Sequence, residues 1–295
     1  MSPRIFSLMT EAAERLEVLL LVDNRVSGPG LRAEWGFSAL LRVESGGRRY
    51  SILLDTGESG TVLLHNMRVL GVDPREPSIL ALSHGHYDHT GGIRALLESG
   101  SKPLVVAHPA AFEPKYAYHG GELTYIGSPV TPEWIRDRTG LLLASNTVKL
   151  APGAYWLGEV EREGFMESHE GLYAARGGRL VDDTVPDDTA VAVNVEGLGA
   201  VVVTGCSHSG ILNIVRKAER VAGKVYAVIG GLHLAWAKPE ESYSVLDRLE
   251  DWGVRKIAPA HCSGIQAACQ AGEIRRGFLL EAGSGARYVF EAPRK

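Results

Sequence analysis

The sequence has 295 residues, of which 45% are hydrophobic and 22% charged, and its net charge at pH 7 is −4. A chain of this length can bury most of its apolar surface, so it needs no metal merely to stay folded, and its weak charge gives no argument for nucleic acid as a partner. No stretch approaches the roughly 18 uninterrupted apolar residues of a membrane span, so we expect a cytoplasmic protein. The sequence does not determine the number of subunits.

The first part of the chain alternates strands with helices. The apolar pattern predicts strands at 16–22, 37–43, 50–57, 78–83 and 103–109, with helices at 60–72 and 90–100. The run SILALS at 78–83 is typical of a short strand in a sheet that is covered on both faces. This order indicates an α/β layered fold.

The middle of the chain is less regular. Residues 110–186 hold prolines, glycines and aromatic residues, and we interpret them as a substrate-facing insertion in a single domain that spans 1–295. A plain surface excursion is the alternative. Regular rhythm then resumes with a strand pair at 189–205, followed by a helix, a strand, a helix and a strand at 210–223, 224–231, 239–253 and 254–261.

Two β-α-β stretches resemble each other. The segments ILLDTGESG and VVVTGCSHSG each open the same series of elements. The series is a strand, a loop that contains Thr-Gly, a helix, a second strand and a loop that bears histidine. Chance similarity is one explanation, and two packed halves that share one site is the other. The second explanation predicts that four loops gather at one edge, where open α/β sheets bind ligands: 55–60, 84–89, 206–210 and 231–235.

The hexapeptide HGHYDH follows the strand at 78–83 directly and carries His84, His86, Asp88 and His89. In an extended loop His84 and His86 point to the same side, because side chains alternate. Imidazole and carboxylate are suitable ligands for zinc, manganese or iron. One ion would leave one of the four groups idle, whereas two ions would use all four. A solvated histidine loop is the alternative to a metal site.

This hexapeptide resembles the signature of the metallo-β-lactamase superfamily. The resemblance also includes Asp55 in LLDTG and the C-terminal segment APAHCSG, which contains His261. It implies an α/β fold of the four-layer αβ/βα sandwich type, with a dinuclear metal site at one edge. It also implies that Asp55 supports the site by hydrogen bonding and that His261 is the last metal ligand.

The family pattern has two further ligands, a histidine before a strand pair and an aspartate or cysteine after it. TVPDDTAV stands at the first place and has no histidine, whereas Cys206 stands at the second place, with His208 close by. We therefore expect His208 to replace the missing imidazole. Cys206 is a further candidate ligand, and Asp188 is another. The expected sets are His84, His86 and His208 for one ion, and Asp88, His89 and His261 for the other.

Six segments together resemble one branch of the superfamily, labelled 7,8-dihydropterin-6-methyl-4-(β-D-ribofuranosyl)aminobenzene-5′-phosphate synthase: LLLVDN, HGHYDHTGG, DDTAVAV, TGCSHSGILNIV, VIGGLHL and PAHCSG. The first functional hypothesis is a metal-dependent hydrolase that attacks a phosphoester, or a related small molecule, with metal-activated water. The alternative is a transferase that condenses a dihydropterin pyrophosphate with a ribofuranosylaminobenzene phosphate. Both need two divalent ions, expected to be zinc, with manganese or iron as alternatives. A flavodiiron-like redox module and a non-catalytic metal-binding module rank lower.

Several residues are assigned to the reaction or to the substrate. Asp88 is expected to orient the attacking water, and His233 to bind substrate or donate a proton, unless it is a structural histidine. A second group is expected to contact a phosphate or a flat ring: Lys115, Tyr116, Tyr118 and His119. A third group is expected to stack on a ring: Trp35, Tyr87 and Trp236.

Overall fold

The computed structural model describes residues 11–292 and builds them around two large β-sheets. The first sheet has the strand order β17 (Arg287–Glu291), β1 (Arg15–Val22), β2 (Ser38–Ser45), β3 (Arg48–Leu54), β4 (Ile79–Ala81), β5 (Leu104–Ala107) and β8 (Leu141–Leu143). The second has the order β16 (Lys256–Ala260), β15 (Val225–Gly231), β14 (Gly199–Thr204), β13 (Ala190–Val195), β10 (Ala154–Trp156) and β9 (Val148–Ala151). The two sheets pack face to face.

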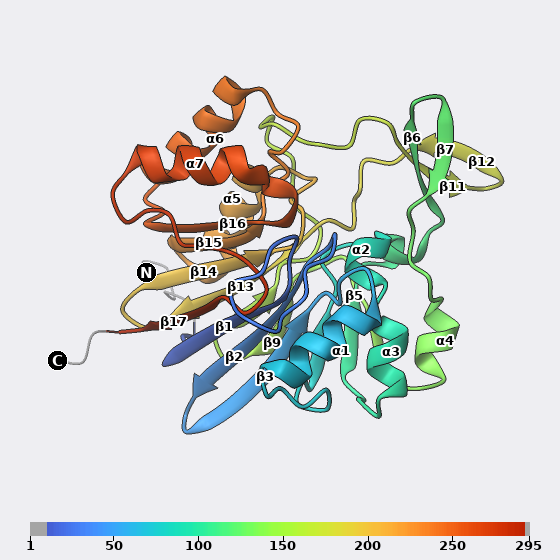
Figure 1. Ribbon diagram of the computed structural model, residues 1–295, viewed down its shortest axis with the longest axis horizontal. Coiled ribbons are helices and arrows are strands. Elements are labelled where there is room, and N and C mark those ends of the chain that lie inside the picture. Colours follow the sequence, from blue (N-terminus) through green and yellow to red (C-terminus); the bar gives the residue numbers. More distant parts are fainter. Residues whose placement is uncertain (1–10, 293–295) are drawn as a thin grey trace, which may run out of the picture.

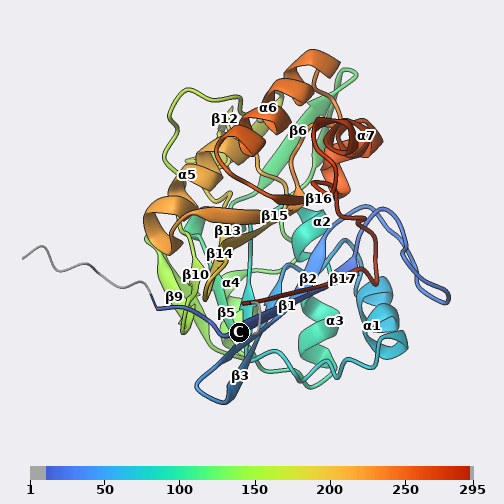
Figure 2. The same cartoon turned by 90° about the vertical axis from the view of Figure 1, so that its left-hand side faces the viewer.

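Helices cover the outer face of each sheet (Figures 1 and 2). The first sheet is covered by α1 (Gly60–Val69), α3 (Ile93–Glu98) and α4 (Pro132–Arg136). The second sheet is covered by α5 (Ile211–Ala222), α6 (Pro239–Asp251) and α7 (Gly264–Ile274). The predicted four-layer αβ/βα sandwich is therefore confirmed. None of the helices within residues 11–292 is both long and apolar enough to cross a membrane.

Three buried apolar clusters hold the layers together. The central cluster lies between the sheets and joins, for example, Leu41 of the first sheet to Val203 of the second. The other two lie beneath the helices. Helix α5 buries Ile211, Ile214 and Val215, which recur at helical spacing and so form one apolar stripe. Each sheet is thus apolar on both faces, which explains the unbroken apolar sequences of its central strands.

Parallel pairing within each sheet brings several strand ends to one edge. Strands β3, β4 and β5 are parallel neighbours, and so are β14, β15 and β16. The loops at the carboxyl ends of these strands include 55–60, 84–89, 206–210 and 231–235. The fold therefore presents these loops at the edges of both sheets, as the internal similarity predicted.

The middle segment is only partly an insertion, which corrects the interpretation of the whole of residues 110–186 as one substrate-facing insertion. Strand β8 belongs to the first sheet, and β9 and β10 belong to the second. What stands apart is a four-stranded antiparallel sheet, which projects from the body in Figure 1. We call this sheet the arm, and its strands are β12 (Arg179–Asp182), β11 (Leu172–Arg176), β6 (Lys115–His119) and β7 (Glu122–Tyr125).

Two further differences concern helices and the end of the chain. The helix predicted at 90–100 is shorter than expected, because α3 begins only after Gly91 and Gly92. A separate single turn, α2 (Tyr87–Thr90), ends before these two glycines. The short helix α2 therefore begins inside the hexapeptide and carries Asp88 and His89 on its single turn. The 3₁₀ turns η1 (Pro109–Phe112) and η2 (His261–Ser263), helix α7 and strand β17 were not predicted.

Candidate metal centre

The loops that follow five strands converge on one buried group of polar side chains. Asp55 follows β3, and its Oδ2 lies 2.7 Å from Nδ1 of His89, in the loop and turn after β4. His89 Nε2 in turn lies 3.2 Å from Sγ of Cys206, which follows β14. The rings of His208 and His233 are 4.4 Å apart between centroids. The expected gathering of the four loops is confirmed, and His261 joins them from the end of β16.

The first donor group is made of His84, His86 and His208. One ring nitrogen from each lies within 4.8 Å of the others, and all three side chains are buried. Burial and neighbouring imidazole rings hold the pKa values of His84 and His86 well below the usual value, so both rings are neutral and keep a lone pair. Neutral imidazole is the form that binds a metal ion.

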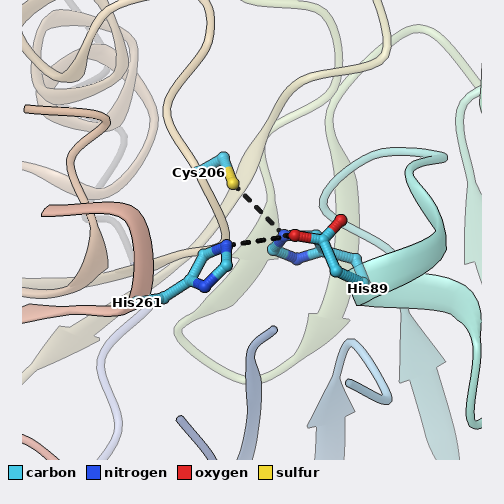
Figure 3. A group of neighbouring side chains, drawn as sticks. His89, Cys206 and His261 are labelled. Carbon is cyan, nitrogen blue, oxygen red and sulfur yellow. Dashed lines mark hydrogen bonds and ion pairs between the residues drawn. The ribbon is translucent and has the colours of Figure 1, made fainter. Parts of the chain in front are cut away.

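The second donor group is made of Asp88, His89, Cys206 and His261, again with one donor atom from each within 4.8 Å of the others. Figure 3 shows Cys206 and His261 pointing toward the turn that carries His89. Asp88 Oδ2 lies 3.3 Å from His261 Nε2 and 3.6 Å from His89 Nε2. Because Cys206 belongs to this group, the chain offers one nitrogen-only donor set and one mixed set of oxygen, nitrogen and sulfur.

The carboxylate of Asp55 holds the rings of two donor-group histidines in place, one directly and one through a serine hydroxyl. Asp55 Oδ2 accepts a hydrogen bond from His89 Nδ1 at 2.7 Å and another from the Ser83 hydroxyl at 2.6 Å. The same hydroxyl lies 2.9 Å from Nδ1 of His84. With Nδ1 engaged, Nε2 of each ring is turned toward the donor groups. The position of Asp55 thus agrees with the supporting role implied by the resemblance.

Backbone and amide oxygens fix two more rings in the same way. His208 Nδ1 donates to the Ser168 carbonyl at 2.6 Å, and His261 Nδ1 lies 3.0 Å from Oδ1 of Asn24. Asp23 accepts a 2.6 Å hydrogen bond from the His261 backbone N–H. Sequence reasoning missed the roles of Asp23, Asn24 and Ser168. For the first two a signal existed, because Asp-Asn directly follows the apolar strand at 16–22.

These donor atoms fit a metal ion on structural grounds. His208 Nε2 is buried and has no hydrogen-bond partner within residues 11–292, although its ring lies 5.0 Å and 4.9 Å from the rings of His84 and His86. A buried polar atom that is left without a partner costs about 1–3 kcal/mol, so such atoms persist where a ligand satisfies them. The free nitrogen faces two neutral imidazoles, which is the surrounding that a cation requires.

Two residues of the second donor group, His89 and Cys206, are protonated in the metal-free protein. Burial alone would lower the pKa of His89, but Asp88 and Asp55 raise it to about 10. Burial raises the pKa of the Cys206 thiol well above its usual value, so the thiol keeps its proton in the metal-free protein. A cation that binds Asp88, His89 and Cys206 must therefore displace protons.

The raised pKa of His89 makes the metal-free protein sensitive to alkaline pH. Because the folded-state pKa of about 10 exceeds the ordinary histidine pKa of 6.5, the stabilisation is complete below pH 6.5 and is lost as pH rises toward 10. One such proton gives a slope of at most about 1.4 kcal/mol per pH unit in the free energy of unfolding. Urea unfolding of chelator-treated protein between pH 6 and 10 measures this slope, and metal-loaded protein is the control. An equal slope in both samples would contradict the assignment.

Strained backbone is concentrated at this centre. Five non-glycine residues within 11–292 have positive φ, and four of them lie in or next to the donor groups: Asp55 (57°), Ser207 (67°), His233 (52°) and His261 (47°). The left-handed conformation is unfavourable for residues with a Cβ, and it persists where the surroundings impose it. The local strain therefore marks the same residues as the donor geometry does.

The expectation that Lys115 contacts a substrate is wrong. Its side chain is fully buried, and its Nζ donates to Asp183 at 2.7 Å and to Asp187 at 2.8 Å. An ammonium that is enclosed and paired twice is not available to a substrate phosphate. Tyr116 packs its ring against Tyr125, and His119 is exposed at the end of β6, so the roles of these two residues stay predictions.

Two other predicted residues lie beside the donor groups. Asp188 Oδ2 accepts hydrogen bonds from the backbone N–H and the hydroxyl of Ser209, so it anchors the loop that carries His208. Burial, together with the nearby rings of His208 and His261, lowers the pKa of His233 to about 2. A neutral imidazole can form a hydrogen bond to a substrate, but it does not carry the extra proton that proton donation by His233 would need.

A two-sheet α/β sandwich with imidazoles and carboxylates gathered at its edge defines a class of metalloprotein. The family model described as the metallo-beta-lactamase superfamily matches residues 35–221. The chain is 36% identical over 245 residues to the 7,8-dihydropterin-6-methyl-4-(beta-D-ribofuranosyl)-aminobenzene-5′-phosphate synthase of Methanocaldococcus jannaschii, a match that covers 80% of this chain and 83% of that protein. The chain belongs to the metallo-β-lactamase superfamily.

Solved structures agree with this assignment. Tm1679, described as a metal-dependent hydrolase of the beta-lactamase superfamily, superposes with a TM-score of 0.78 at 28% identity and covers 92% of this chain and 98% of its own. The metallo-beta-lactamase fold protein YhfI of Bacillus subtilis gives a TM-score of 0.57 at 15% identity, and covers 92% of this chain and 99% of its own. This second likeness shows the fold alone.

Proposed function

We propose that this protein is a hydrolase with a dinuclear metal site, and that it acts on a phosphoester or a related small molecule. The observation that carries the proposal is the pair of adjacent donor groups, whose rings of His84 and His89 lie 4.2 Å apart between centroids. His84, His86 and His208 would hold one ion, and Asp88, His89 and His261 the other, with Cys206 as a further ligand. We propose zinc, with manganese or iron as alternatives, since imidazole and thiolate suit zinc.

The chemistry that divalent cations supply in such a site is a water acidic enough to lose its proton near pH 7 and a polarised phosphoryl oxygen. The side chains add orientation. Burial would raise the pKa of Asp88, but His89 and His261 hold it well below its usual value, so the carboxylate stays ionised and can accept a hydrogen bond from the attacking water. His233, held neutral, would bind the substrate through a hydrogen bond.

A transferase is the second candidate, favoured by the 36% identity to a synthase whose name combines a dihydropterin and an aminobenzene ribofuranosyl phosphate. The same donor groups would then polarise an electrophile that an aromatic amine attacks in place of water. The two candidates differ in the nucleophile and agree on the metal ligands. Fold membership does not decide between them, because one fold hosts many reactions.

Metal analysis and substrate panels test the proposal. We expect about two equivalents of divalent metal after gentle purification, and hydrolysis of at least one compound in a panel of chromogenic phosphodiesters, thioesters and lactones. Less than one equivalent of metal would contradict the dinuclear site. No hydrolysis anywhere in the panel, together with turnover of a dihydropterin pyrophosphate and a ribofuranosylaminobenzene phosphate, would replace the hydrolase with the transferase.

A further inference from the structure

Two tryptophan side chains are exposed beside the metal centre. Trp35 lies in the connection between β1 and β2, and Trp236 follows β15, so the two come from opposite sheets. Their ring centroids are 6.0 Å apart. The exposed fraction is 40% for Trp35 and 65% for Trp236. Large aromatic side chains of this kind are usually buried, so an exposed pair that meets from distant parts of the chain calls for an explanation by function.

The inner sides of both indoles contact the donor groups. Trp35 packs edge-on against His261, with 4.9 Å between centroids. Trp236 packs against His233 at 5.0 Å, and His233 packs against His208 at 4.4 Å. The five rings therefore form an arc that starts at a histidine of the first donor group and ends at a histidine of the second. The indoles are the most exposed rings of this arc, whereas His233 is half-buried and the other two histidines are buried.

A second observation points to a ligand at this arc. His233 Nδ1 is buried and has no hydrogen-bond partner within residues 11–292, and its backbone is held at a φ of 52°. The strained backbone thus keeps a histidine beneath Trp236 although one of its nitrogen atoms bonds to nothing there. A purely structural ring in this place would be expected to have that nitrogen satisfied.

We infer that Trp35 and Trp236 form a subsite for a planar aromatic ring of the substrate, at the mouth of the metal centre. Indole faces bind flat rings by offset or edge-to-face stacking at centroid separations of about 4.5–7 Å. A ring stacked on Trp236 would be separated from His208 only by Trp236 and His233, which leaves the rest of the substrate within reach of the donor groups. The inference rests on the proposed function for the identity of the reacting group, but not for the binding of the ring.

Isothermal titration calorimetry with two probes tests the subsite. The ring probe is 6-hydroxymethylpterin, and the probe without an aromatic ring is ribose 5-phosphate. We expect Trp35→Leu and Trp236→Leu each to weaken pterin binding by about 3- to 10-fold, the range of one aromatic pair, and to leave ribose 5-phosphate binding unchanged. Trp236→Phe should restore most of the pterin affinity. Both side chains lie at the surface, at 40% and 65% exposure, so the variants should fold normally, as circular dichroism can verify.

Trp134→Leu is the matched control. Trp134 lies on α4 in the layer that covers the first sheet, where Arg138 and Arg94 stack on its ring at 3.9 Å and 4.6 Å. This variant should bind both probes as the original protein does. Unchanged pterin affinity in both subsite variants, or no pterin binding by the original protein, would overturn the inference.

The same titrations separate the subsite from the proposed function. They are repeated on chelator-treated protein and on the His86→Ala variant, which should lack metal in the first donor group. Pterin affinity that survives metal loss but falls in the tryptophan variants supports the subsite, even if no hydrolysis is found. Hydrolysis and metal content that match expectation, with pterin affinity unaffected by either tryptophan, would leave the proposed function intact and remove the subsite.

Discussion

His86→Ala should reduce turnover by more than about 100-fold and lower the metal content of the protein, while the fold survives. Loss of a residue that merely orients a ligand costs 10- to 100-fold in metal affinity or activity, so loss of a ligand should cost more. The fold should survive because, among residues 11–292, the ring makes no ion pair and its buried Nε2 has no hydrogen-bond partner. Turnover and metal analysis measure the first effect, and thermal unfolding measures the second.

His65→Ala is the matched control for this experiment. His65 lies on α1, where its ring nitrogen bonds to the Gly30 carbonyl, outside both donor groups. This variant should keep its metal and its turnover. If His86→Ala bound as much metal as the original protein and turned over as fast, the assignment of the first donor group would be wrong.

Lys115→Met should lower the free energy of unfolding by about 3–5 kcal/mol, the usual cost of removing one partner of a buried ion pair. The substitution would leave Asp183 and Asp187 enclosed at 1% exposure each. Arg176, 3.5 Å from Asp183, would be the cation that remains beside them. Burial would lower the pKa of Lys115, but these carboxylates raise it, so the ammonium is charged throughout the physiological range. Urea unfolding of metal-loaded protein measures the loss.

Two further variants make this result specific. Lys149→Met removes a half-exposed ammonium that pairs with Glu11 at the surface, and should cost at most about 1 kcal/mol. Adding Asp183→Asn and Asp187→Asn to Lys115→Met should recover part of the lost stability, because no unpaired charge then stays buried. A cost below about 1 kcal/mol for Lys115→Met alone would show that the buried triad is not needed for folding.

The triad also ties the arm to the metal centre. Asp187 Oδ2 accepts a 2.7 Å hydrogen bond from the backbone N–H of Gly85, between His84 and His86. A Cβ on Gly85 would come within 1.9 Å of the Ala111 carbonyl oxygen, so the loop can pass there only with glycine. We therefore expect Lys115→Met to weaken metal binding at His84 and His86 as well as the fold.

Much of the fold follows from local sequence, because the central strands are apolar on both faces and the helices carry one apolar stripe. The placement of HGHYDH after such a strand predicted the location of the centre as well. The elements within residues 110–186 could not be predicted, since β8, β9 and β10 are only three or four residues long and are specified by the sheets that they join. The burial of Lys115 was missed for a related reason, because its partner carboxylates lie about 70 residues away.

The support of the imidazoles was only partly predictable. Asp55 was anticipated through the family resemblance. Ser168 binds His208 through its backbone carbonyl, a group that every residue carries, so the identity of the side chain at that position could not predict the contact. The position of Asn24 directly after an apolar strand was a signal for the site, but its partner His261 lies 237 residues further on and no local pattern links the two.

Each donor group draws on both halves of the sandwich, since His84, His86, Asp88 and His89 follow a strand of the first sheet, and Cys206, His208 and His261 follow strands of the second. A cation held by either group would cross-link the two sheets. During synthesis such a cross-link could form only after residue 208, for one group, and residue 261, for the other, had left the ribosome. Metal uptake should consequently be a late event in maturation. Protein from cells starved of metal should be folded, but its two sheets should separate more easily.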